Sequence, residues 1–505
     1  MSARHTLTGN ASYKLGEANE LATDLLFSTR GGSRRYDIFY RDLDAARALT
    51  GLRDQLSSGD HGENSFEGAF SHKHTFARQH SLETELRANR ESESGTNAYT
   101  RDSLALDGTP LSNPERENQR TLERPYELSL KTDYTRPLGT HTRLEAGYKG
   151  TLSGFRTALN TDVLDYATNA FLPDTARTNG FTYRQLVHAA YGLLHLERGA
   201  LAFEPGLRVE HTTTRFGVSG RPDQFNGGYD SFFPSALLAL APDETHTMTL
   251  SYSKRIRRPD DVDLLDPTVH YQDPENLSRG NPDLKPEYIH ALELGLQRST
   301  GSSTVQLTPF FRRTVNAVRR IRTIDDQGIA TTTFANLSTS DAYGTDVEVS
   351  MRQGRVTGFA GASAFRQVSD AANLSSDYST RSWGWTGRAN LTVHATTLLD
   401  VQTMLSYRSA MTVVQGRNFA RTVVNLAARQ KLPGERTSLT LRIVDLLNTN
   451  HEGSTTTDPR FYQESNRRMH ARGVFLGINY TFGKPPKERP PEPTDLPESS
   501  SGGTP

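Results

Sequence analysis

Short segments that alternate apolar and polar side chains recur along the whole chain, and the connections between them are alternately short and long. In residues 126–134, for example, Tyr126, Leu128 and Leu130 share one face, and charged or hydroxyl side chains share the other. A period of two is typical of a β-strand with one apolar and one polar face. The pattern therefore predicts an antiparallel sheet of hairpins, with the short turns gathered at one end.

The segments also have the length that a membrane-spanning strand requires. About 19 segments reach the roughly 9–11 residues with which a tilted strand crosses a bilayer. No window approaches 18 consecutive apolar residues, so the sequence predicts no transmembrane helix. A closed barrel is the other structure that satisfies its own backbone in lipid. We therefore predict an all-β fold, a transmembrane antiparallel β-barrel of about 19–20 strands, with short periplasmic turns and long extracellular loops.

The predicted long loops are polar stretches without a clear apolar face. They are residues 42–64, 90–123, 157–180, 217–230 and 257–287. Aromatic side chains stand near the ends of predicted strands, as expected for girdles at the two membrane interfaces. These are Tyr13, Tyr126, Tyr134, Tyr252, Tyr407, Tyr480 and Phe482.

Composition excludes several classes of protein. The 58 basic and 58 acidic side chains balance, whereas a nucleic-acid-binding protein would carry a basic excess. The chain has no cysteine, which rules out disulfide scaffolds, thiolate metal sites and a cysteine nucleophile. A soluble extracellular β-protein is an alternative, but apolar outer faces flanked by aromatic residues argue against it.

Three motifs follow one another in the middle of the chain. They read Tyr-Ser-Lys-Arg-Ile-Arg-Arg-Pro at residues 252–259, Tyr-Gln-Asp-Pro at 271–274 and Gly-Asn-Pro-Asp-Leu-Lys-Pro-Glu at 280–287. Together with Asp-Leu-Leu-Asn-Thr at 445–449 and the closing strand at 473–483, they resemble the C-terminal barrel half of TonB-dependent outer-membrane receptors. The residues that carry the motifs are Tyr252, Arg255, Pro259, Gly280, Asn281, Pro282, Lys285, Pro286 and Glu287.

The resemblance implies a location, a function and a set of partners. It implies a 22-stranded barrel in the outer membrane that takes up a scarce solute, such as a ferric siderophore or an oligosaccharide. Its partners would be outer-membrane lipid and lipopolysaccharide, the barrel-assembly machinery, and TonB if a plug domain precedes the barrel. Tyr480 and Phe482 would form the assembly signal of the closing strand. The rival functions are a plugless passive pore and a surface adhesin.

The resemblance and the strand count also divide the chain. We expect residues 1–483 to form the barrel and residues 484–505, rich in proline and serine, to form a disordered periplasmic tail. The first residues lack an apolar secretory region. An odd strand count would leave the two ends of the barrel on opposite sides. We therefore expect this sequence to lack a signal, a plug and about three strands of the family's barrel.

Two basic stretches are candidates for binding an anionic solute. The first is the loop that contains Arg255, Arg257 and Arg258. The second is residues 305–322, which we predict to be one strand with Arg313 and Arg319 above the apolar band. The weak candidates for substrate binding are Arg255, Arg257, Arg258, Arg312, Arg320 and Arg322. Exposed charges of both signs also pair with one another or remain solvated, so a purely structural role is the alternative.

No catalytic or metal site is predicted. His72 and His74 share one strand face near His80, but no cysteine or suitably spaced carboxylate completes a zinc or nickel site. The chain has no nucleophile elbow, phosphate-binding loop or zincin helix. We therefore predict no metal, no cofactor and no enzymatic activity.

Overall fold

The structure is a computed structural model of the chain. It describes residues 2–43, 48–219, 224–260, 262–267, 270–273, 276–326, 329–434, 436–468 and 472–482. The tail expected at residues 484–505 lies outside the described residues. No helix in these ranges is both long and apolar enough to cross a membrane.

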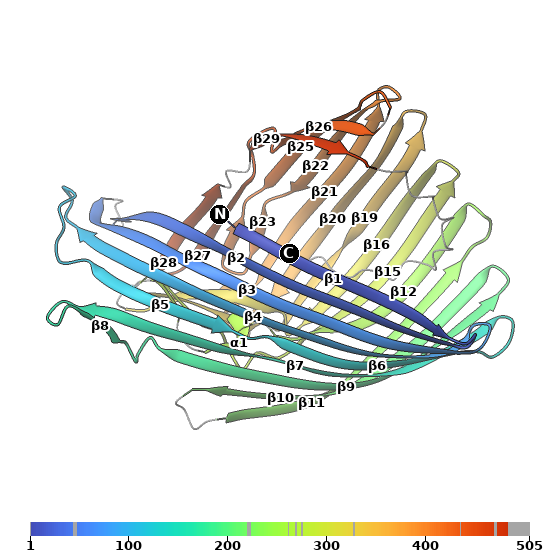
Figure 1. Cartoon of the computed structure of the whole chain (residues 1–505), viewed down its shortest axis with the longest axis horizontal. Helices are drawn as coiled ribbons and strands as arrows, with labels where there is room; N and C mark the ends of the chain where they lie inside the picture. Colours follow the sequence, from blue (N-terminus) through green and yellow to red (C-terminus); the bar gives the residue numbers. More distant parts are fainter. Residues whose placement is uncertain are drawn as a thin grey trace.

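One large antiparallel sheet, strongly curled, makes up most of the molecule (Figure 1). The first half of the sheet contains β1 (Ser2–Leu15), β2 (Asn19–Leu43), β3 (Leu49–Ala77), β4 (His80–Leu104), β5 (Glu115–Glu123), β6 (Tyr126–Pro137), β7 (Thr142–Asp165), β8 (Ala170–Pro173), β9 (Asn179–Arg198), β10 (Leu201–Val218) and β11 (Gln224–Leu240). The second half contains β12 (His246–Arg257), β15 (Glu287–Thr300), β16 (Ser303–Val315), β19 (Thr339–Gln353), β20 (Val356–Asp370), β21 (Thr380–His394), β22 (Leu399–Arg408), β25 (Arg421–Lys431), β26 (Thr437–Val444) and β29 (Gly473–Tyr480).

The sheet confirms the predicted strand number. It contains 21 strands, but β5 and β6 pair one after the other with both β4 and β7, so they form one interrupted strand. Likewise, β8 and β9 pair one after the other with β7. Merging each pair leaves 19 strands, within the range that the alternating pattern predicts.

Short turns gather at one end of the strands and longer segments at the other (Figure 1). The tightest turns place glycine where the backbone must adopt a positive φ. Gly199 lies between β9 and β10 with φ of 60°, and Gly354 lies between β19 and β20 with φ of 56°. Two-residue hairpin turns favour glycine at such positions because their twist matches the twist of the strands.

The two faces of the sheet differ in polarity. On β2 and β3 the register pairs Phe27 with Phe66 and Leu25 with Gly68, and Phe27, Phe66 and Leu25 are exposed on one side. The opposite side carries Ser28, Ser65 and other polar residues, which are buried. An outward apolar face around a polar interior is the arrangement of a membrane barrel.

The predicted loops at residues 42–64, 90–123, 157–180 and 217–230 are largely strands, so these predictions were wrong. β2, β3, β4 and β7 are 25, 29, 25 and 24 residues long, far more than a bilayer requires. Most residues of the extensions are polar, as in β3 and β4, so alternation of apolar residues reveals them poorly. The extensions of β2 and β7 do carry apolar side chains, such as Ile38, Phe39, Phe155 and Leu159. The extensions form because neighbouring strands satisfy one another's backbone groups beyond the membrane.

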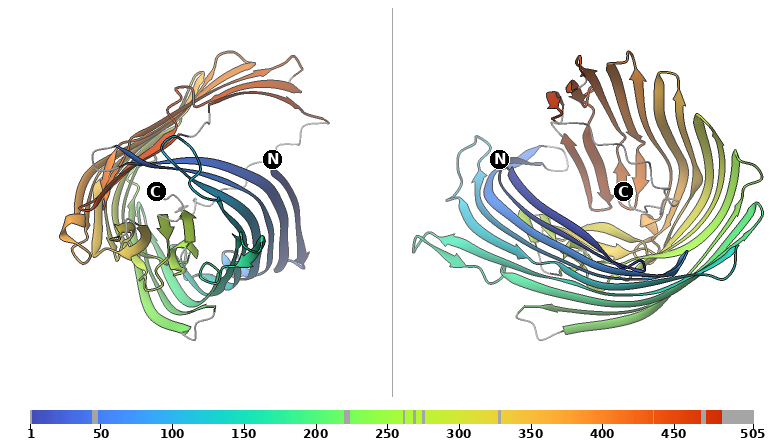
Figure 2. Two further views of the ribbon diagram at one scale, coloured as in Figure 1. Left: turned by 90° about the vertical axis from the view of Figure 1, so that its left-hand side faces the viewer. Right: turned by 45° about the vertical axis from the view of Figure 1, so that its right-hand side comes forward.

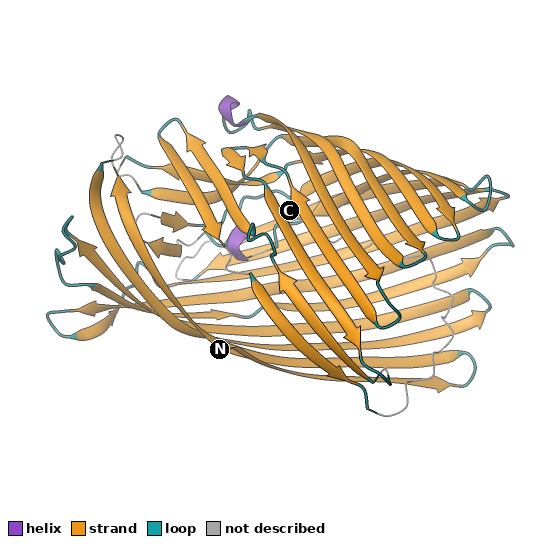
Figure 3. Cartoon of the chain, turned by 90° about the horizontal axis from the view of Figure 1, so that it is seen from above, coloured by secondary structure: helices purple, strands orange, loops and turns teal. Residues whose placement is uncertain are grey.

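Segments that join the strands at the long-loop end fold back inside the curve of the sheet (Figures 2 and 3). They form two small sheets and one short helix. The first inserted sheet contains β13 (His270–Asp273), β14 (Asn276–Ser278), β17 (Val318–Ile324) and β18 (Ala330–Asn336), and follows the helix α1 (Val262–Leu265). The second contains β23 (Met411–Val413), β24 (Gly416–Asn418), β27 (His451–Asp458) and β28 (Phe461–Arg468). A single 3₁₀ turn, Ser376–Tyr378, lies between β20 and β21.

The first inserted sheet corrects one prediction. Residues 305–322 are two strands, since β16 ends at Val315 and β17 belongs to the inserted sheet. Asn316 between them has φ of 57°, so the chain turns there. Arg313 remains on the outer face of the main sheet, opposite Asp341, but Arg319 is carried inside.

One glutamine joins the two inserted sheets. Gln415, in the turn between β23 and β24, accepts a hydrogen bond from the Arg322 backbone N–H at 2.7 Å and donates to the Arg322 carbonyl at 2.9 Å. It also donates to the Tyr378 hydroxyl, which donates to Asp458. Val414, beside it, packs with Ile321 in one of the buried apolar clusters. The inserted sheets therefore hold each other in place.

Candidate functional site

A pocket of about 730 Å³ opens between the inner face of the main sheet and the inserted segments. Five of its lining residues are arginines, against two carboxylates. The lining consists of Arg257, Arg258, Pro259, Asp260, Leu264, Glu287, Val318, Arg319, Arg320, Phe334, Gln367, Arg408, Ser409, Met411, Val413 and Asn418. We refer to it as the basic pocket.

Two of the arginines are held by carboxylates of the sheet. Arg257 forms an ion pair with Glu287, its cross-strand partner on β15. Arg258 forms an ion pair with Glu210 of β10 and donates a hydrogen bond to the Tyr229 hydroxyl at 3.1 Å. The carboxylates of the main sheet hold both arginines in position and neutralise most of their charge.

Glu287 links the wall to the first inserted sheet. Its side chain is only 1% exposed and accepts a hydrogen bond from the Val318 backbone N–H at 2.5 Å. The Arg319 guanidinium lies 3.8 Å from the same carboxylate. Burial, helped by the charge of Arg257, lowers the pKa of Arg319 below its usual value, although Glu287 opposes the shift. Glu287 thus anchors β17 against the main sheet.

The other two arginines have unpaired side chains. Within the part of the chain that the structure describes, the guanidinium groups of Arg320 and Arg408 have neither an ion pair nor a hydrogen bond. They reach the pocket from β17 and from the end of β22, beside the apolar side chains of Phe334, Met411 and Val413. Unpaired guanidinium groups beside apolar side chains can hold a molecule that carries anionic groups on an aromatic or aliphatic body.

The predicted binding residues divide into two groups. Arg257, Arg258 and Arg320 line the basic pocket. Arg255, Arg312 and Arg322 do not. Arg312 pairs with Glu293 at 2.8 Å, Arg322 contacts Asn276, and Arg255 is exposed on β12.

Arg319 and Arg408 are pocket residues that the sequence does not indicate. The alternating pattern predicts Arg319 on the outer face because β17 reads as a continuation of β16. Arg408 lies more than a hundred residues from the basic motif in the sequence and stands alone at a strand end. A basic residue where a strand meets a long loop was the only available signal.

The Gly-Asn-Pro motif holds the segments around the basic pocket in place but, apart from Glu287, does not line the pocket. The Gly280 N–H donates to the Asp266 carbonyl at 2.6 Å, and the Asn281 side chain donates to the Phe334 carbonyl at 2.9 Å. The Lys285 N–H donates to the Asn336 side chain at 2.9 Å. These bonds tie the segment after α1 to β18, so the motif is structural apart from Glu287.

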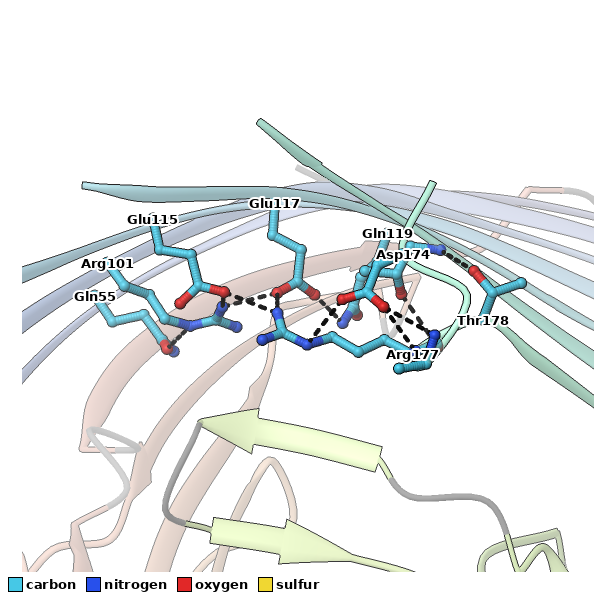
Figure 4. Close-up of polar contacts among 10 residues, drawn as sticks. Gln55, Arg101, Glu115, Glu117, Gln119, Asp174, Arg177 and Thr178 are labelled. Carbon is cyan, nitrogen blue, oxygen red and sulfur yellow. Dashed lines mark hydrogen bonds and ion pairs between the residues drawn. The ribbon is translucent and has the colours of Figure 1, made fainter. Parts of the chain in front are cut away.

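A second polar network lies farther along the inner face, on β3, β4 and β5 (Figure 4). Glu117 is 1% exposed and accepts hydrogen bonds from Arg101 at 2.8 Å, Arg177 at 2.8 Å and Gln119 at 2.5 Å. Arg177 also pairs with Glu115 at 2.8 Å. Neighbouring side chains occupy the hydrogen-bonding positions of the Glu117 carboxylate. The network therefore fixes the segment before β9 on the inner face of the main sheet.

The histidines of the outer face make hydrogen bonds within the protein. His72 and His74 both contact the Asn19 side-chain oxygen, at 3.0 and 2.8 Å, and His80 contacts the Tyr134 hydroxyl at 3.1 Å. Among the residues that the structure describes, no group of three or more histidine, aspartate or glutamate side chains is placed to bind a metal.

Comparison with known proteins bears on the fold. The model of a family described as the outer membrane protein beta-barrel family matches residues 74–480. No curated protein matches the sequence. The fold resembles the ferric-catecholate import receptor Fiu from E. coli K12, with a TM-score of 0.58 and 14% identity over 95% of this chain and 75% of that chain.

Two further solved structures share this fold. The siderophore receptor PiuA from Acinetobacter baumannii has a TM-score of 0.57 and 12% identity, over 94% of this chain and 79% of that chain. The copper transporter OprC has a TM-score of 0.55 and 11% identity, over 95% of this chain and 80% of that chain. At these identities the likeness shows the fold alone.

Proposed function

Because the chain belongs to the outer membrane protein beta-barrel family and lies in the outer membrane, we propose that it is the barrel of a TonB-dependent receptor that takes up an anionic solute. A ferric siderophore is the preferred cargo. An oligosaccharide, the other cargo that the motifs imply, fits the pocket less well because it offers no charge to the free arginines.

The observation that carries this proposal is the pair of unpaired arginines in the basic pocket. Arg320 and Arg408 come from different elements and line one cavity with Phe334 and Met411. A guanidinium without a carboxylate partner, in a pocket rich in other arginines, favours an anionic ligand by charge and by bidentate hydrogen bonding. Several ferric siderophores combine such charge with aromatic rings. The neighbour Fiu is named a ferric-catecholate import receptor and the neighbour PiuA a siderophore receptor.

The proposed partners follow from the same function. TonB would act through a plug domain, and the barrel-assembly machinery would recognise the closing strand through Tyr480 and Phe482. These two rings pack edge to face, with centroids 4.6 Å apart, and Phe482 is exposed. Lipid and lipopolysaccharide would surround the outer apolar face. We propose no enzymatic role.

Uptake by cells tests the function and separates it from its rivals. Cells that make the protein in its native form, with a signal and a plug domain, should accumulate radiolabelled iron from an anionic ferric catecholate, and accumulation should stop when the proton-motive force is collapsed. Uptake that persists without the proton-motive force would indicate a passive pore. Binding of cells to host surfaces without any uptake would indicate an adhesin. The double substitution R320Q/R408Q should abolish uptake, and R388Q, which removes an inner arginine outside the basic pocket, should not.

A further inference from the structure

The first inserted sheet has a free edge along β17. In an antiparallel pair, the backbone groups of successive residues point alternately toward the partner strand and away from it. The Leu337 N–H donates to the Ala317 carbonyl at 2.7 Å, so the odd-numbered residues of β17 are the ones that bond to β18. The N–H and C=O groups of Val318, Arg320 and Arg322 therefore point to the free edge.

Side chains occupy this edge on both sides of Arg320. The Val318 N–H donates to the Glu287 carboxylate at 2.5 Å. Gln415 bonds to both the N–H and the C=O of Arg322. Among the residues that the structure describes, the N–H and C=O of Arg320 have no partner. Between these two contacts the edge is thus open at a single residue.

The open residue borders the basic pocket. Val318, Arg319 and Arg320 all line the pocket. Successive side chains of a strand point to opposite faces, so a cavity that touches three successive residues meets the strand at its edge. The other edge of β17 is covered by β18. A solute in the pocket therefore has access to the backbone of Arg320 as well as to its guanidinium.

A peptide-type amide matches the open edge. A residue laid antiparallel beside Arg320 would accept a hydrogen bond from the Arg320 N–H and donate one to the Arg320 carbonyl, as an added strand does. The side chain of that residue would lie directly opposite the Arg320 side chain, where an anionic group can pair with the guanidinium. The occupied positions at Val318 and Arg322 are about 13 Å apart along the strand, so about three residues fit between them.

We infer that the solute of the basic pocket carries a peptide-type amide and an anionic group on the same residue. The inference rests on the proposed function, because it concerns the same pocket. It narrows the cargo to anionic solutes with a short peptide-like segment.

Equilibrium titration of the purified protein with three blocked tripeptides tests the inference. N-acetyl-Gly-Asp-Gly-amide carries both the amide and the charge. Its depsipeptide, in which an ester oxygen replaces the aspartate N–H, lacks only the donor, and N-acetyl-Gly-Asn-Gly-amide lacks only the charge. The depsipeptide should bind about threefold to tenfold more weakly than the peptide, because one hydrogen bond to the Arg320 carbonyl is lost. The asparagine peptide should bind about tenfold more weakly, because a charge-assisted hydrogen bond is lost.

Substitution of Arg320 tests the same contact from the side of the protein. R320A removes the guanidinium, whereas R320P removes the guanidinium and the N–H, which an edge strand can lose without breaking its ladder. R320P should therefore bind the acidic peptide about threefold to tenfold more weakly than R320A. If R320P fails to assemble, the comparison of peptide and depsipeptide on the wild type decides the question alone.

The outcomes separate the inference from the proposed function. Equal affinity for the peptide and the depsipeptide, or equal affinity of R320A and R320P for the peptide, would overturn the inference. An acidic peptide that does not bind, when an anionic ferric catecholate does, would overturn it too and leave the proposed function standing. If binding of neither the catecholate nor the peptide responds to R320Q/R408Q, the proposed function itself fails.

Discussion

At the residue scale, the basic pocket shows what a charged motif can and cannot predict. Of the basic residues after Tyr252, Arg257 and Arg258 line the basic pocket, yet carboxylates of the main sheet neutralise both. The side chains that remain free, Arg320 and Arg408, come from segments that the chain brings together only by folding. A sequence states which residues are charged, but the pairing of those charges depends on register and on inserted segments.

Gly280 gives a sharp test of the motif at this scale. A Cβ at this position would lie 2.6 Å from the Asp266 nitrogen and 2.7 Å from the Leu265 nitrogen, both of them backbone atoms. The substitution G280A should displace α1 from the inner face of the main sheet. It should lower the stability of the protein by about 1–3 kcal/mol, as at other overpacked sites. Limited proteolysis should show faster cleavage near α1. The control G301A, with nothing within 4 Å of the added carbon, should behave like the wild type. Equal cleavage of the two variants would show that the close approach has no consequence.

At the scale of single elements, the inserted sheets depend on a few polar contacts. Gln415 makes both a donated and an accepted hydrogen bond to the Arg322 backbone. The substitution Q415L should leave those backbone groups unsatisfied and destabilise the contact by about 1–3 kcal/mol. Hydrogen exchange of β17 and β23 should then be faster, whereas the main sheet should be unaffected. Q402L removes a glutamine that contacts Asn390 on the main sheet and is the matched control. If hydrogen exchange of β17 and β23 is unchanged in Q415L, then Gln415 does not join the two inserted sheets.

The position of β21 can be tested with the only two tryptophans of the chain. Trp383 and Trp385 stack with ring centroids 6.1 Å apart and are 54% and 51% exposed on the outer face. In liposomes their fluorescence should be quenched by brominated lipids, most strongly when the bromine lies near the head group. A water-soluble quencher should have little effect. The opposite result would place these side chains in the lumen or in solvent and would reverse the assigned faces.

At the scale of the whole molecule, the sequence predicted the number of strands and the polarity of the sheet's two faces. It failed above the membrane, where β3 and β4 continue with mostly polar residues, and inside the sheet, where loops form sheets of their own. Lipid imposes the alternating pattern only on the spanning part of each strand. Elsewhere, the strands are held by backbone hydrogen bonds to their neighbours, which require no particular pattern of side chains.

The edges of the sheet also bear on the strand count. Among the described residues, β1 pairs with β2 alone and β29 with β26 alone. With 19 antiparallel strands, β1 and β29 run in the same direction, so they cannot close the barrel by pairing antiparallel with each other. An odd number of strands between them would permit closure.

The proposed function depends on binding of an anionic solute in the basic pocket through Arg320 and Arg408. Equilibrium titration of the purified protein with an anionic ferric catecholate, compared with a neutral oligosaccharide, measures this binding. The wild type should bind the catecholate, and added salt should weaken that binding. R320Q/R408Q should bind about tenfold to a hundredfold more weakly, since two charged hydrogen-bonding groups are lost. The control R388Q should bind like the wild type. Tighter binding of the oligosaccharide, or equal affinity of R320Q/R408Q and the wild type for the catecholate, would contradict the claim.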